Sequence, residues 1–223
     1  SLILGGMVAT QAVADDYACQ VNTLIGTKGT GLTSGYLYPG ATYPYGMVQF
    51  TPSYFSKRSG FVINQLSGGG CEHMGNFPTF PVKGKLKMSP DNILNYRINI
   101  SEEKGHAGYY EAMVQKDIKA KLTVTERTGM ASYEYPADQQ YGTIIIGGGI
   151  SATPIEQAAI VITAPNKCEG YAEGGNFCGL RTPYKVYFVA EFDTDALETG
   201  TWKREELMPN TTFAEGEYSG VYF

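Results

Sequence analysis

The segment from Leu66 to Pro78, called the glycine loop below, combines three adjacent glycines with polar side chains that can bind a small ligand. Because glycine has no Cβ, the stretch from Gly68 to Gly70 lets backbone amides come close to a ligand. The candidate ligand-binding residues are Ser67, Gly69, Gly70, Cys71, Glu72, His73 and Asn76. Such a loop can hold sugar hydroxyls, or it can be a turn whose polar residues bond only the local backbone. No Gly-Lys-Ser/Thr follows, so a phosphate-binding loop is disfavoured.

Three side chains of the glycine loop differ in their chemistry. Glu72 can accept hydrogen bonds from sugar hydroxyls or simply be solvated. His73 can donate to a sugar oxygen or to a phosphate on a substrate, and a histidine bonded to the loop backbone is the alternative. Cys71 has no nearby base that would make it a nucleophile, so we interpret it as part of a pocket wall.

Aromatic side chains elsewhere could stack on a sugar ring. Four tyrosines share one Pro/Gly-rich stretch, where most are expected to be packing residues: Tyr36, Tyr38, Tyr43 and Tyr45. The lone Trp202 lies in a charged segment, so we expect it at the surface. We interpret His106, within Lys-Gly-His-Ala-Gly, as a turn residue.

Alternation of apolar and polar residues predicts the strands that must position these groups. The run from Ile118 to Thr125 predicts a strand with one face in water, and Tyr184 to Phe192 has the same period. Thr143 to Ile146 is a short apolar run, which predicts burial on both faces. Further strands are expected at Gly46 to Thr51, Phe61 to Leu66, Val82 to Met88, Tyr109 to Val114 and Met130 to Tyr135, and one begins at Glu217 to Phe223.

The composition fits a single all-β domain, an antiparallel β-sandwich with few helices. The chain has 223 residues, of which 28 are glycine and 17 tyrosine, a balance that favours short strands and tight turns. The net charge is −5, and no basic cluster exceeds the pairs Lys57-Arg58 and Lys203-Arg204. A nucleic-acid partner is therefore excluded from consideration.

The first fourteen residues are apolar and end in Ala-Val-Ala, the pattern that signal peptidase cleaves. We interpret residues 1–14 as a partial signal peptide and residues 15–223 as the domain; an ordinary N-terminal strand or helix is the alternative. Export would place the protein in the periplasm, at the cell surface or outside a bacterium. The residues before Cys19 lack the leucine of a lipoprotein signal. No later segment approaches 18 continuous apolar residues, so no transmembrane segment is expected.

The four cysteines are Cys19, Cys71, Cys168 and Cys178. The last two flank a polar, glycine-rich segment that we interpret as a loop, and a disulfide would restrain it. We predict a Cys168–Cys178 disulfide, with two reduced and buried thiols as the alternative.

Three phrases in this order resemble the opening of glycoside hydrolase family 92: VNTLIGT from Val21, YPGATYPYGMVQFTP from Tyr38, and LSGGGCEHMGNFP from Leu66. A fourth match joins Gly108-Tyr-Tyr to the Leu-Thr-x-Thr-x-Arg-x-Gly strand that ends at Gly129. The resemblance covers about Val21 to Phe223.

This resemblance implies a two-domain exo-α-mannosidase: an N-terminal sandwich of the galactose-mutarotase-like supersandwich type, and a C-terminal (α/α)6 domain as its partner. The family inverts the anomeric centre and uses calcium, whose ligands lie mainly outside this chain. The substrate is a mannose-containing glycan. Both catalytic carboxylates come from the C-terminal domain, so none is assigned here. The glycine loop would wall the subsite for the terminal mannose.

The sequence departs from the family pattern just before the glycine loop and within it. Glu72, His73 and Met74 replace an Asp-Tyr type pair, and Val62 to Gln65 replaces a Ser-His-Thr-His run. This fits a subgroup that accepts a linkage other than α-1,2 or a substituted mannoside. Two other functions are possible alternatives: a non-catalytic carbohydrate-binding sandwich and a mutarotase-like epimerase. The epimerase needs two histidines and a glutamate in one cleft. Because His73 and His106 are the only histidines, the epimerase is disfavoured.

Overall fold

The structure is a computed structural model that describes residues 17–27, 37–53, 60–65, 74–90, 99–147 and 155–223. Within these ranges the only helical element is a short 3-10 helix, η1 (Tyr17–Gln20). The remaining elements are strands in three sheets, and all paired neighbours run antiparallel. The expected all-β fold is confirmed.

The largest sheet, called the central sheet, has eight strands. In spatial order these are β1 (Ala41–Thr42), β2 (Gln49–Pro52), β3 (Phe61–Val62), β4 (Thr79–Lys83), β9 (Gly142–Gly147), β16 (Ser219–Tyr222), β13 (Gly200–Lys203) and β14 (Glu206–Pro209). The β5–β8 sheet contains β5 (Ile100–His106), β6 (Tyr109–Val114), β7 (Ile118–Val124) and β8 (Gly129–Glu134). The β10–β12 sheet contains β12 (Leu180–Glu191), β11 (Lys167–Phe177), β10 (Ile155–Ala164) and β15 (Phe213–Glu215).

The central sheet is covered on both faces. Ile145 and Tyr222 belong to one apolar cluster, which includes Leu122 of the β5–β8 sheet. Their sequence neighbours Ile146 and Val221 belong to a second cluster with residues of the β10–β12 sheet. Since successive side chains of a strand point to opposite faces, the two clusters lie on opposite sides of the central sheet. This double burial explains why the run from Thr143 to Ile146 contains three consecutive isoleucines and does not alternate with polar residues.

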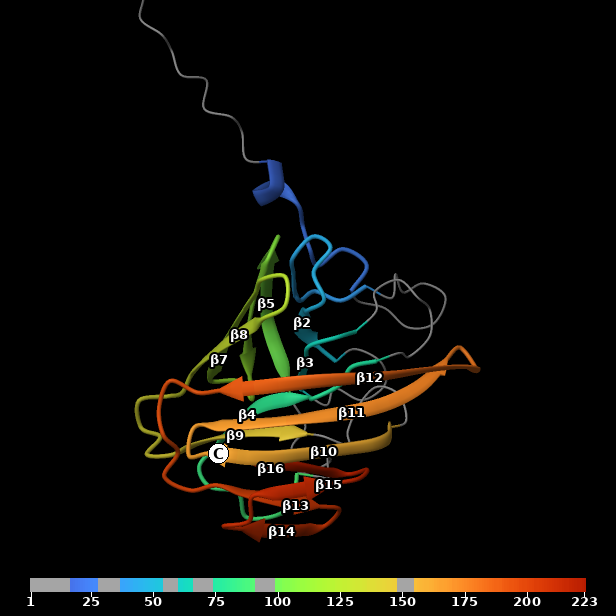
Figure 1. Cartoon of the computed structure of the whole chain (residues 1–223). Coiled ribbons are helices and arrows are strands. Elements are labelled where there is room, and N and C mark those ends of the chain that lie inside the picture. Colours follow the sequence, from blue (N-terminus) through green and yellow to red (C-terminus); the bar gives the residue numbers. More distant parts are fainter. Residues whose placement is uncertain (1–16, 28–36, 54–59, 66–73, 91–98, 148–154) are drawn as a thin grey trace, which may run out of the picture.

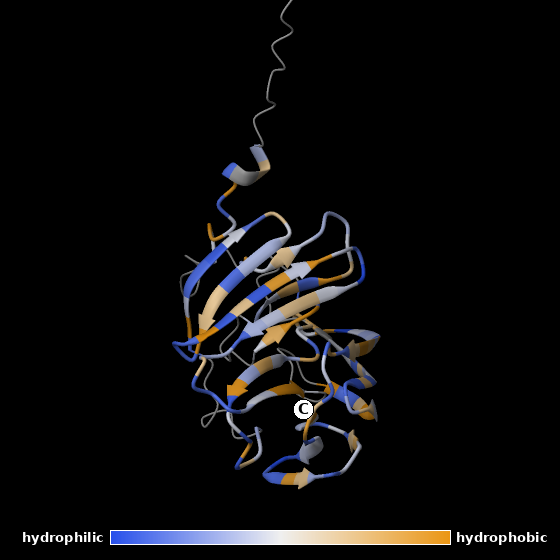
Figure 2. Ribbon diagram, turned by 90° about the vertical axis from the view of Figure 1, so that its left-hand side faces the viewer, coloured by the Kyte–Doolittle hydropathy of each residue, from blue (hydrophilic) through white to orange (hydrophobic). Residues whose placement is uncertain are grey.

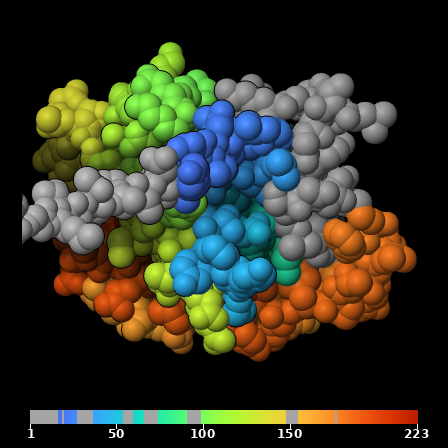
Figure 3. Space-filling model, turned by 90° about the horizontal axis from the view of Figure 1, so that it is seen from above, coloured from blue at the N-terminus to red at the C-terminus, as the bar shows by residue number. Residues whose placement is uncertain are grey.

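The outer sheets each bury one face, as the alternation predicts. In β7, Ile118, Ala120 and Leu122 are fully buried, while Thr123 is exposed. In β12 the residues from Tyr184 onward alternate between half-buried and exposed. The alternation of apolar and polar segments is visible along the strands in Figure 2. Figure 3 shows the β5–β8 strands in green and the end of the β11–β12 hairpin in orange on opposite sides of the segment 37–53.

The predicted strand at Tyr109 to Val114 coincides with β6. The prediction at Val82 to Met88 is displaced, because the strand is β4 (Thr79–Lys83) and Gly84 follows it with φ of +71°. The left-handed conformation interrupts the extended backbone at Gly84, and β4 ends just before it.

The predicted Cys168–Cys178 disulfide is wrong. The segment between these cysteines is not a loop but the strand β11 (Lys167–Phe177), in which Cys168 lies opposite Ala190 and Phe177 opposite Leu180. A strand rises about 3.3 Å per residue, so the two cysteines lie roughly 30 Å apart, far beyond the reach of a disulfide. Cys168 is a free, buried thiol, and burial raises its pKa to about 12. Cys178 is disulfide-bonded to another cysteine.

The predicted surface position of Trp202 is also wrong. Trp202 lies on β13 and is 0% exposed, packed in the cluster between the central sheet and the β5–β8 sheet. Gly220 pairs with it on β16, and a Cβ at Gly220 would lie 2.2 Å from the Trp202 ring. The glycine therefore leaves the space that the indole fills. In the part of the chain that the structure describes, no helix is long and apolar enough to cross a membrane.

Candidate functional site

Most of the predicted sugar-binding residues lie outside the described residues. This holds for Ser67, Gly69, Gly70, Cys71, Glu72 and His73, all within 66–73. The structure describes residues 60–65, which precede the loop, and residues 74–90, which contain its end and the chain after it; these two stretches are called its shoulders. The last predicted site residue, Asn76, is 0% exposed. The contacts between these two stretches therefore define the base of the loop.

The two shoulders are held against each other by the side chain of Asn64. Its Oδ1 accepts a hydrogen bond of 2.7 Å from the backbone amide of Asn76, and its Nδ2 donates one of 2.9 Å to Asn76 Oδ1. The backbone adds a bond of 2.7 Å from the Gly75 amide to the Asn64 carbonyl, beside the isolated bridge between Gln65 and Met74. The loop is therefore closed at its base by two asparagines.

The chain turns sharply as it leaves the loop. Met74, Gly75 and Phe77 have φ angles of 62°, 83° and 52°, so three residues of four adopt the left-handed conformation. Non-glycine residues pay a steric penalty in this region, and such strain often marks a functional segment. Here it directs Asn76 back toward Asn64.

A strand of the outer sheet fixes the same asparagine from the other side. The Tyr184 hydroxyl on β12 donates a hydrogen bond of 3.1 Å to Asn76 Oδ1. Nearby, the rings of Phe77 and Phe188 pack with centroids 4.1 Å apart. Three segments that are distant in the sequence thus meet at the base of the glycine loop. Sequence reasoning assigned Asn76 to the site but missed Asn64 and Tyr184 as its partners.

Three buried polar atoms in this region make no hydrogen bond within the structure: Asn76 Nδ2 and both amide atoms of Gln65. Gln65 is 1% exposed. Leaving a buried polar group unpaired costs roughly 1–3 kcal/mol, so such groups in a native fold need an explanation. A polar ligand bound beside Gln65 and Asn76 would provide partners for them. In the sequence, the only indication that Gln65 has a special role was that Val62 to Gln65 replaces the Ser-His-Thr-His run of the family.

The described residues do not by themselves offer a calcium site. Calcium takes six to eight oxygen ligands, chiefly carboxylates and carbonyls. Across the described ranges, no three His, Cys, Asp or Glu side chains gather into a cluster that could hold a metal ion.

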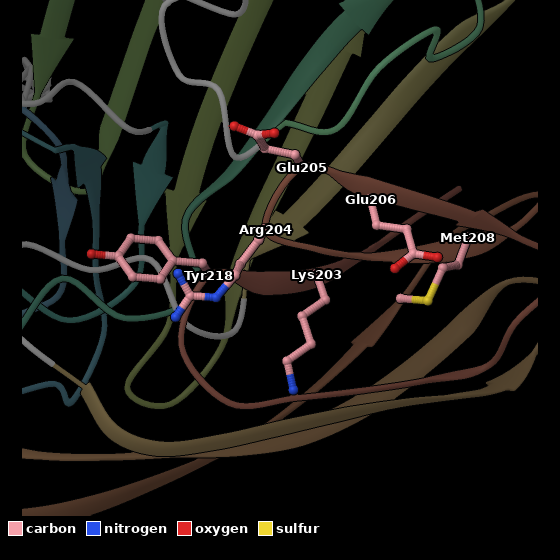
Figure 4. Close-up of a pocket in the computed structure, with 6 residues that line it drawn as sticks. All are labelled: Lys203, Arg204, Glu205, Glu206, Met208 and Tyr218. Atoms are coloured by element: carbon pink, nitrogen blue, oxygen red, sulfur yellow. The ribbon is translucent and has the colours of Figure 1, made fainter.

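A cleft of about 580 Å³ lies at the β13–β14 hairpin, lined by Lys203, Arg204, Glu205, Glu206, Met208 and Tyr218. Figure 4 shows the Arg204 side chain directed toward the Tyr218 ring, and its guanidinium carbon lies 5.3 Å from the ring centroid. The side chains of the neighbouring residues Glu205 and Glu206 point in different directions. They do not converge, so this cleft lacks the facing carboxylates that glycoside hydrolysis needs.

A second cleft, of about 350 Å³, lies beside Phe223 and is partly lined by Tyr135, Glu198 and Tyr222. The Tyr135 hydroxyl donates a hydrogen bond of 3.0 Å to the Thr143 carbonyl, and burial raises the pKa of Tyr135 and of Tyr222. Glu198 forms an ion pair with Lys85. These tyrosines stay protonated at neutral pH and the carboxylate is paired, so the three groups do not form an acid–base system.

His106 lies in the β5–β6 hairpin. It is exposed at the end of β5 and stacks on Tyr109, with ring centroids 5.0 Å apart. Its Nδ1 lies 3.1 Å from the Ala107 carbonyl in the turn that follows. The prediction of a turn residue is therefore wrong by one position: His106 is the last residue of β5 and pairs with Tyr109, and the turn of the β5–β6 hairpin is formed by the next two residues.

Comparisons with known proteins give one consistent result. The sequence model of the glycosyl hydrolase family 92 N-terminal domain matches residues 20–223. A protein of Arthroderma benhamiae, described as an uncharacterized secreted glycosidase, is 30% identical over 159 residues, covering 61% of this chain and 20% of that protein.

Solved structures share the fold. A family GH92 α-mannosidase from Bacteroides thetaiotaomicron matches with a TM-score of 0.78 at 24% identity, covering 95% of this chain and 32% of that one. An inverting family GH92 mannosidase from the same species, strain VPI-5482, matches with a TM-score of 0.69 at 24% identity, covering 91% and 28%. The chain therefore spans between 20% and 32% of the length of these proteins.

Proposed function

Because the chain belongs to glycosyl hydrolase family 92, matching its N-terminal domain over residues 20–223, we propose that it forms part of a secreted, calcium-dependent, inverting exo-α-mannosidase. In this proposal the sandwich walls the subsite for a terminal mannose of a glycan. The observation that supports this most is the family match over nearly the whole chain, which includes the glycine loop. The two Bacteroides enzymes of the same fold are described as mannosidases.

The proposed contacts to mannose are made by Ser67, Gly69, Gly70, Cys71, Glu72, His73 and Asn76. The bonds between Asn64 and Asn76 support this role, because they fix the described residues on either side of 66–73 relative to each other. A site whose flanking residues are already fixed loses less conformational entropy on binding. The unpaired amide of Gln65 adds a residue that could bond a sugar hydroxyl.

No catalytic residue is assigned to this chain. An inverting glycosidase needs a carboxylic acid with a raised pKa and a carboxylate across the sugar, about 6.5–9.5 Å apart. Two glutamates of the β5–β8 sheet have the opposite property: hydrogen bonds to Tyr109 and to Lys121 lower the pKa of Glu111 and of Glu134 respectively. We propose that the acid and base belong to a C-terminal (α/α)6 domain. Calcium, bound mainly by that domain, would polarise the sugar's vicinal hydroxyls.

Export of the protein is part of the same proposal. It is supported by the apolar residues 1–14 and by the relative described as secreted. The signal-peptide cleavage near Asp15 stays a prediction, and sequencing the N-terminus of the mature protein tests it.

The decisive experiment uses the full-length protein with defined α-1,2, α-1,3, α-1,6 and 1-phospho mannosides. We expect mannose release that a calcium chelator abolishes and added calcium restores. No release from any of these substrates contradicts the enzyme, and binding without release favours a carbohydrate-binding sandwich. Residues 15–223 alone should show no turnover; hydrolysis by this fragment would show that the catalytic groups are misassigned.

Variants of the full-length protein test the loop itself. Glu72→Gln and His73→Ala should each raise KM by about tenfold, the loss expected for one hydrogen bond to a charged or polar partner. Glu217→Gln is the matched control, because Glu217 is exposed on the β15–β16 connection. Equal kinetics for all three variants would remove Glu72 and His73 from the site.

A further inference from the structure

The outer face of the β10–β12 sheet carries exposed apolar side chains. Ile160, Ala172 and Phe188, one from each of β10, β11 and β12, belong to the apolar cluster against the central sheet or pack on it. Since successive side chains of a strand point to opposite faces, their sequence neighbours point away from the central sheet. Among these neighbours, Tyr187 is 69% exposed and Val189 is 61% exposed. Large exposed apolar surfaces mark binding sites more often than single exposed residues do.

The strand register brings the outward-facing side chains together in two rows across the sheet. The first row contains Tyr187, Tyr171, Ala159 and Glu215, and the second contains Val189, Glu169, Val161 and Phe213. Neighbouring strands lie about 4.8 Å apart, so adjacent side chains of a row are within contact distance. Figure 1 shows β10, β11 and β12 side by side across the molecule. The eight residues form one surface, called the tyrosine face below.

The two tyrosines of this face are held in place by one lysine. The rings of Tyr171 and Tyr187 lie with centroids 6.1 Å apart and planes inclined by 48°. The Lys185 ammonium lies 4.0 Å from the Tyr171 centroid and 5.5 Å from the Tyr187 centroid. The same ammonium forms an ion pair with Glu173. A cation that contacts both rings and is itself fixed by a carboxylate favours one arrangement of the tyrosine pair.

The side of the tyrosines away from the lysine adjoins short side chains. Along β12, Lys185 precedes Tyr187 and Val189 follows it, so the second row lies on the side opposite the lysine. Val189 and Val161 in that row are shorter than a tyrosine, and Ala159 in the first row is shorter still. A flat ligand can therefore lie on these short side chains with one face against a tyrosine ring.

The charges on the tyrosine face select the kind of ligand. Lys185 and Lys167, which border the face, each form an ion pair with a glutamate. Among the residues that the structure describes, Glu169 and Glu215 within the face form no ion pair. The surface is therefore net acidic, which disfavours an acidic polymer or an anionic lipid surface as its ligand. A neutral ligand with hydroxyl groups fits, because carboxylates accept hydrogen bonds from hydroxyls.

A sugar ring has both properties that this surface matches. Its C–H groups form apolar patches that pack on aromatic rings, and its hydroxyls donate to carboxylates. We propose that the tyrosine face binds a neutral glycan chain, with sugar rings stacked on its two tyrosines and hydroxyls bonded to Glu169 and Glu215. This site is separate from the glycine loop, because Tyr184, which contacts the base of that loop, lies on the inward side of β12.

A second glycan-binding surface has a physical use in a member of a glycosyl hydrolase family. When one part of a polymer is bound at one site, the effective concentration of the rest of the chain at another site on the same protein rises. The tyrosine face therefore increases affinity for a long glycan more than for a single sugar. The choice of mannan as the glycan rests on the proposed function.

Affinity electrophoresis and titration calorimetry of the full-length protein with soluble α-mannan test the tyrosine face. Tyr187→Ala should weaken binding of the polymer by about tenfold, the loss expected for one aromatic stacking contact. Tyr187→Phe keeps the ring and should bind as the wild type does. Tyr17→Ala is the matched control, because Tyr17 is 70% exposed on η1, which packs beside β5 in a different sheet. Equal affinities of Tyr187→Ala and the wild type, or no binding of α-mannan by the wild type, overturn the proposal.

Two further measurements separate the proposal from its alternatives. Sedimentation of the wild type and of Tyr187→Ala should give the same mass; a dimer that Tyr187→Ala converts to a monomer would identify a second copy of the chain as the occupant and overturn the proposal. Mannose release from the small defined mannosides is measured independently of binding. Binding of α-mannan that depends on Tyr187, without mannose release, supports the tyrosine face and contradicts the proposed function. Release by a protein whose mannan affinity is unchanged in Tyr187→Ala contradicts the tyrosine face alone.

Discussion

The Tyr184 hydroxyl donates a hydrogen bond of 3.1 Å to Oδ1 of Asn76, a residue 108 positions earlier in the chain. The same oxygen accepts a bond of 2.9 Å from Asn64 Nδ2. One carbonyl oxygen therefore connects the two shoulders of the glycine loop to a strand of the β10–β12 sheet. This contact makes the positions of Asn64 and Asn76 depend on how that sheet packs.

Tyr184→Phe should lower the free energy of unfolding by about 1 kcal/mol, since one hydrogen bond is lost while Asn76 Oδ1 keeps its bond to Asn64. Urea unfolding, followed by the fluorescence of the buried Trp202, measures the change. In the full-length protein the mannoside KM should also rise. Tyr187→Phe is the control, because Tyr187 is 69% exposed on the opposite face of β12. Identical behaviour of the two variants would show that the Tyr184 bond does not hold the loop.

Gln65→Leu should have opposite effects on the stability of the protein and on its binding of mannosides. Both amide atoms of Gln65 are buried and unpaired in the structure, so a leucine of similar volume should stabilise the unliganded protein by about 1 kcal/mol. If the amide serves the sugar, the same change raises KM for mannosides about tenfold in the full-length protein. Urea unfolding and steady-state kinetics measure the two effects. A less stable Gln65→Leu protein would show that the amide is satisfied in solution and has a structural role.

The strands could be predicted from the sequence where one face is buried and the other is exposed to solvent. The alternation in Ile118 to Thr125 follows from its burial pattern in β7, and the apolar run from Ile144 to Ile146 follows from the two outer sheets that cover β9. The strand β5 could not be predicted in this way, because most of its residues are exposed or half-buried at the edge of a sheet.

Glycine was the main source of error. The segment EGYAEGGNF was interpreted as a loop, yet Gly170 and Gly174 lie within β11. A Cβ at Gly170 would lie 2.3 Å from the Ala159 carbonyl, and one at Gly174 would lie 2.8 Å from the Tyr184 hydroxyl. These glycines allow close contacts across the sheet, and such contacts between distant segments are invisible in the local sequence. The partnership of Asn76 with Tyr184 was hidden for the same reason.

Gly220→Ala should destabilise the protein by about 2–3 kcal/mol or more, as expected for overpacking of a core. The added methyl would lie 2.2 Å from the Trp202 ring and 2.4 Å from the Ile146 carbonyl. Thermal unfolding by circular dichroism measures the loss. The double variant Gly220→Ala with Trp202→Phe should be less destabilised than the sum of the single variants, because the smaller ring removes one of the two clashes. Additive effects would show that Trp202 does not fill this space.

Glu111→Gln should destabilise the protein at neutral pH and not at acidic pH. Its carboxylate accepts a hydrogen bond of 2.8 Å from the Tyr109 hydroxyl and lies 3.4 Å from the Lys119 ammonium, which together lower the pKa of Glu111 below its ordinary value of 4.5. A carboxyl whose pKa is lower in the folded state stabilises the fold above the unfolded pKa, and this contribution is lost as the pH falls through the folded value. Because the pair is partly solvated, we expect about 0.5 kcal/mol at pH 7, fading below about pH 4.5. Urea unfolding of both proteins from pH 7 to pH 3 measures the difference, with Glu217→Gln as the exposed control. A difference that persists unchanged at pH 3 would mean that the glutamine disturbs packing on β6 and that the charge contributes nothing.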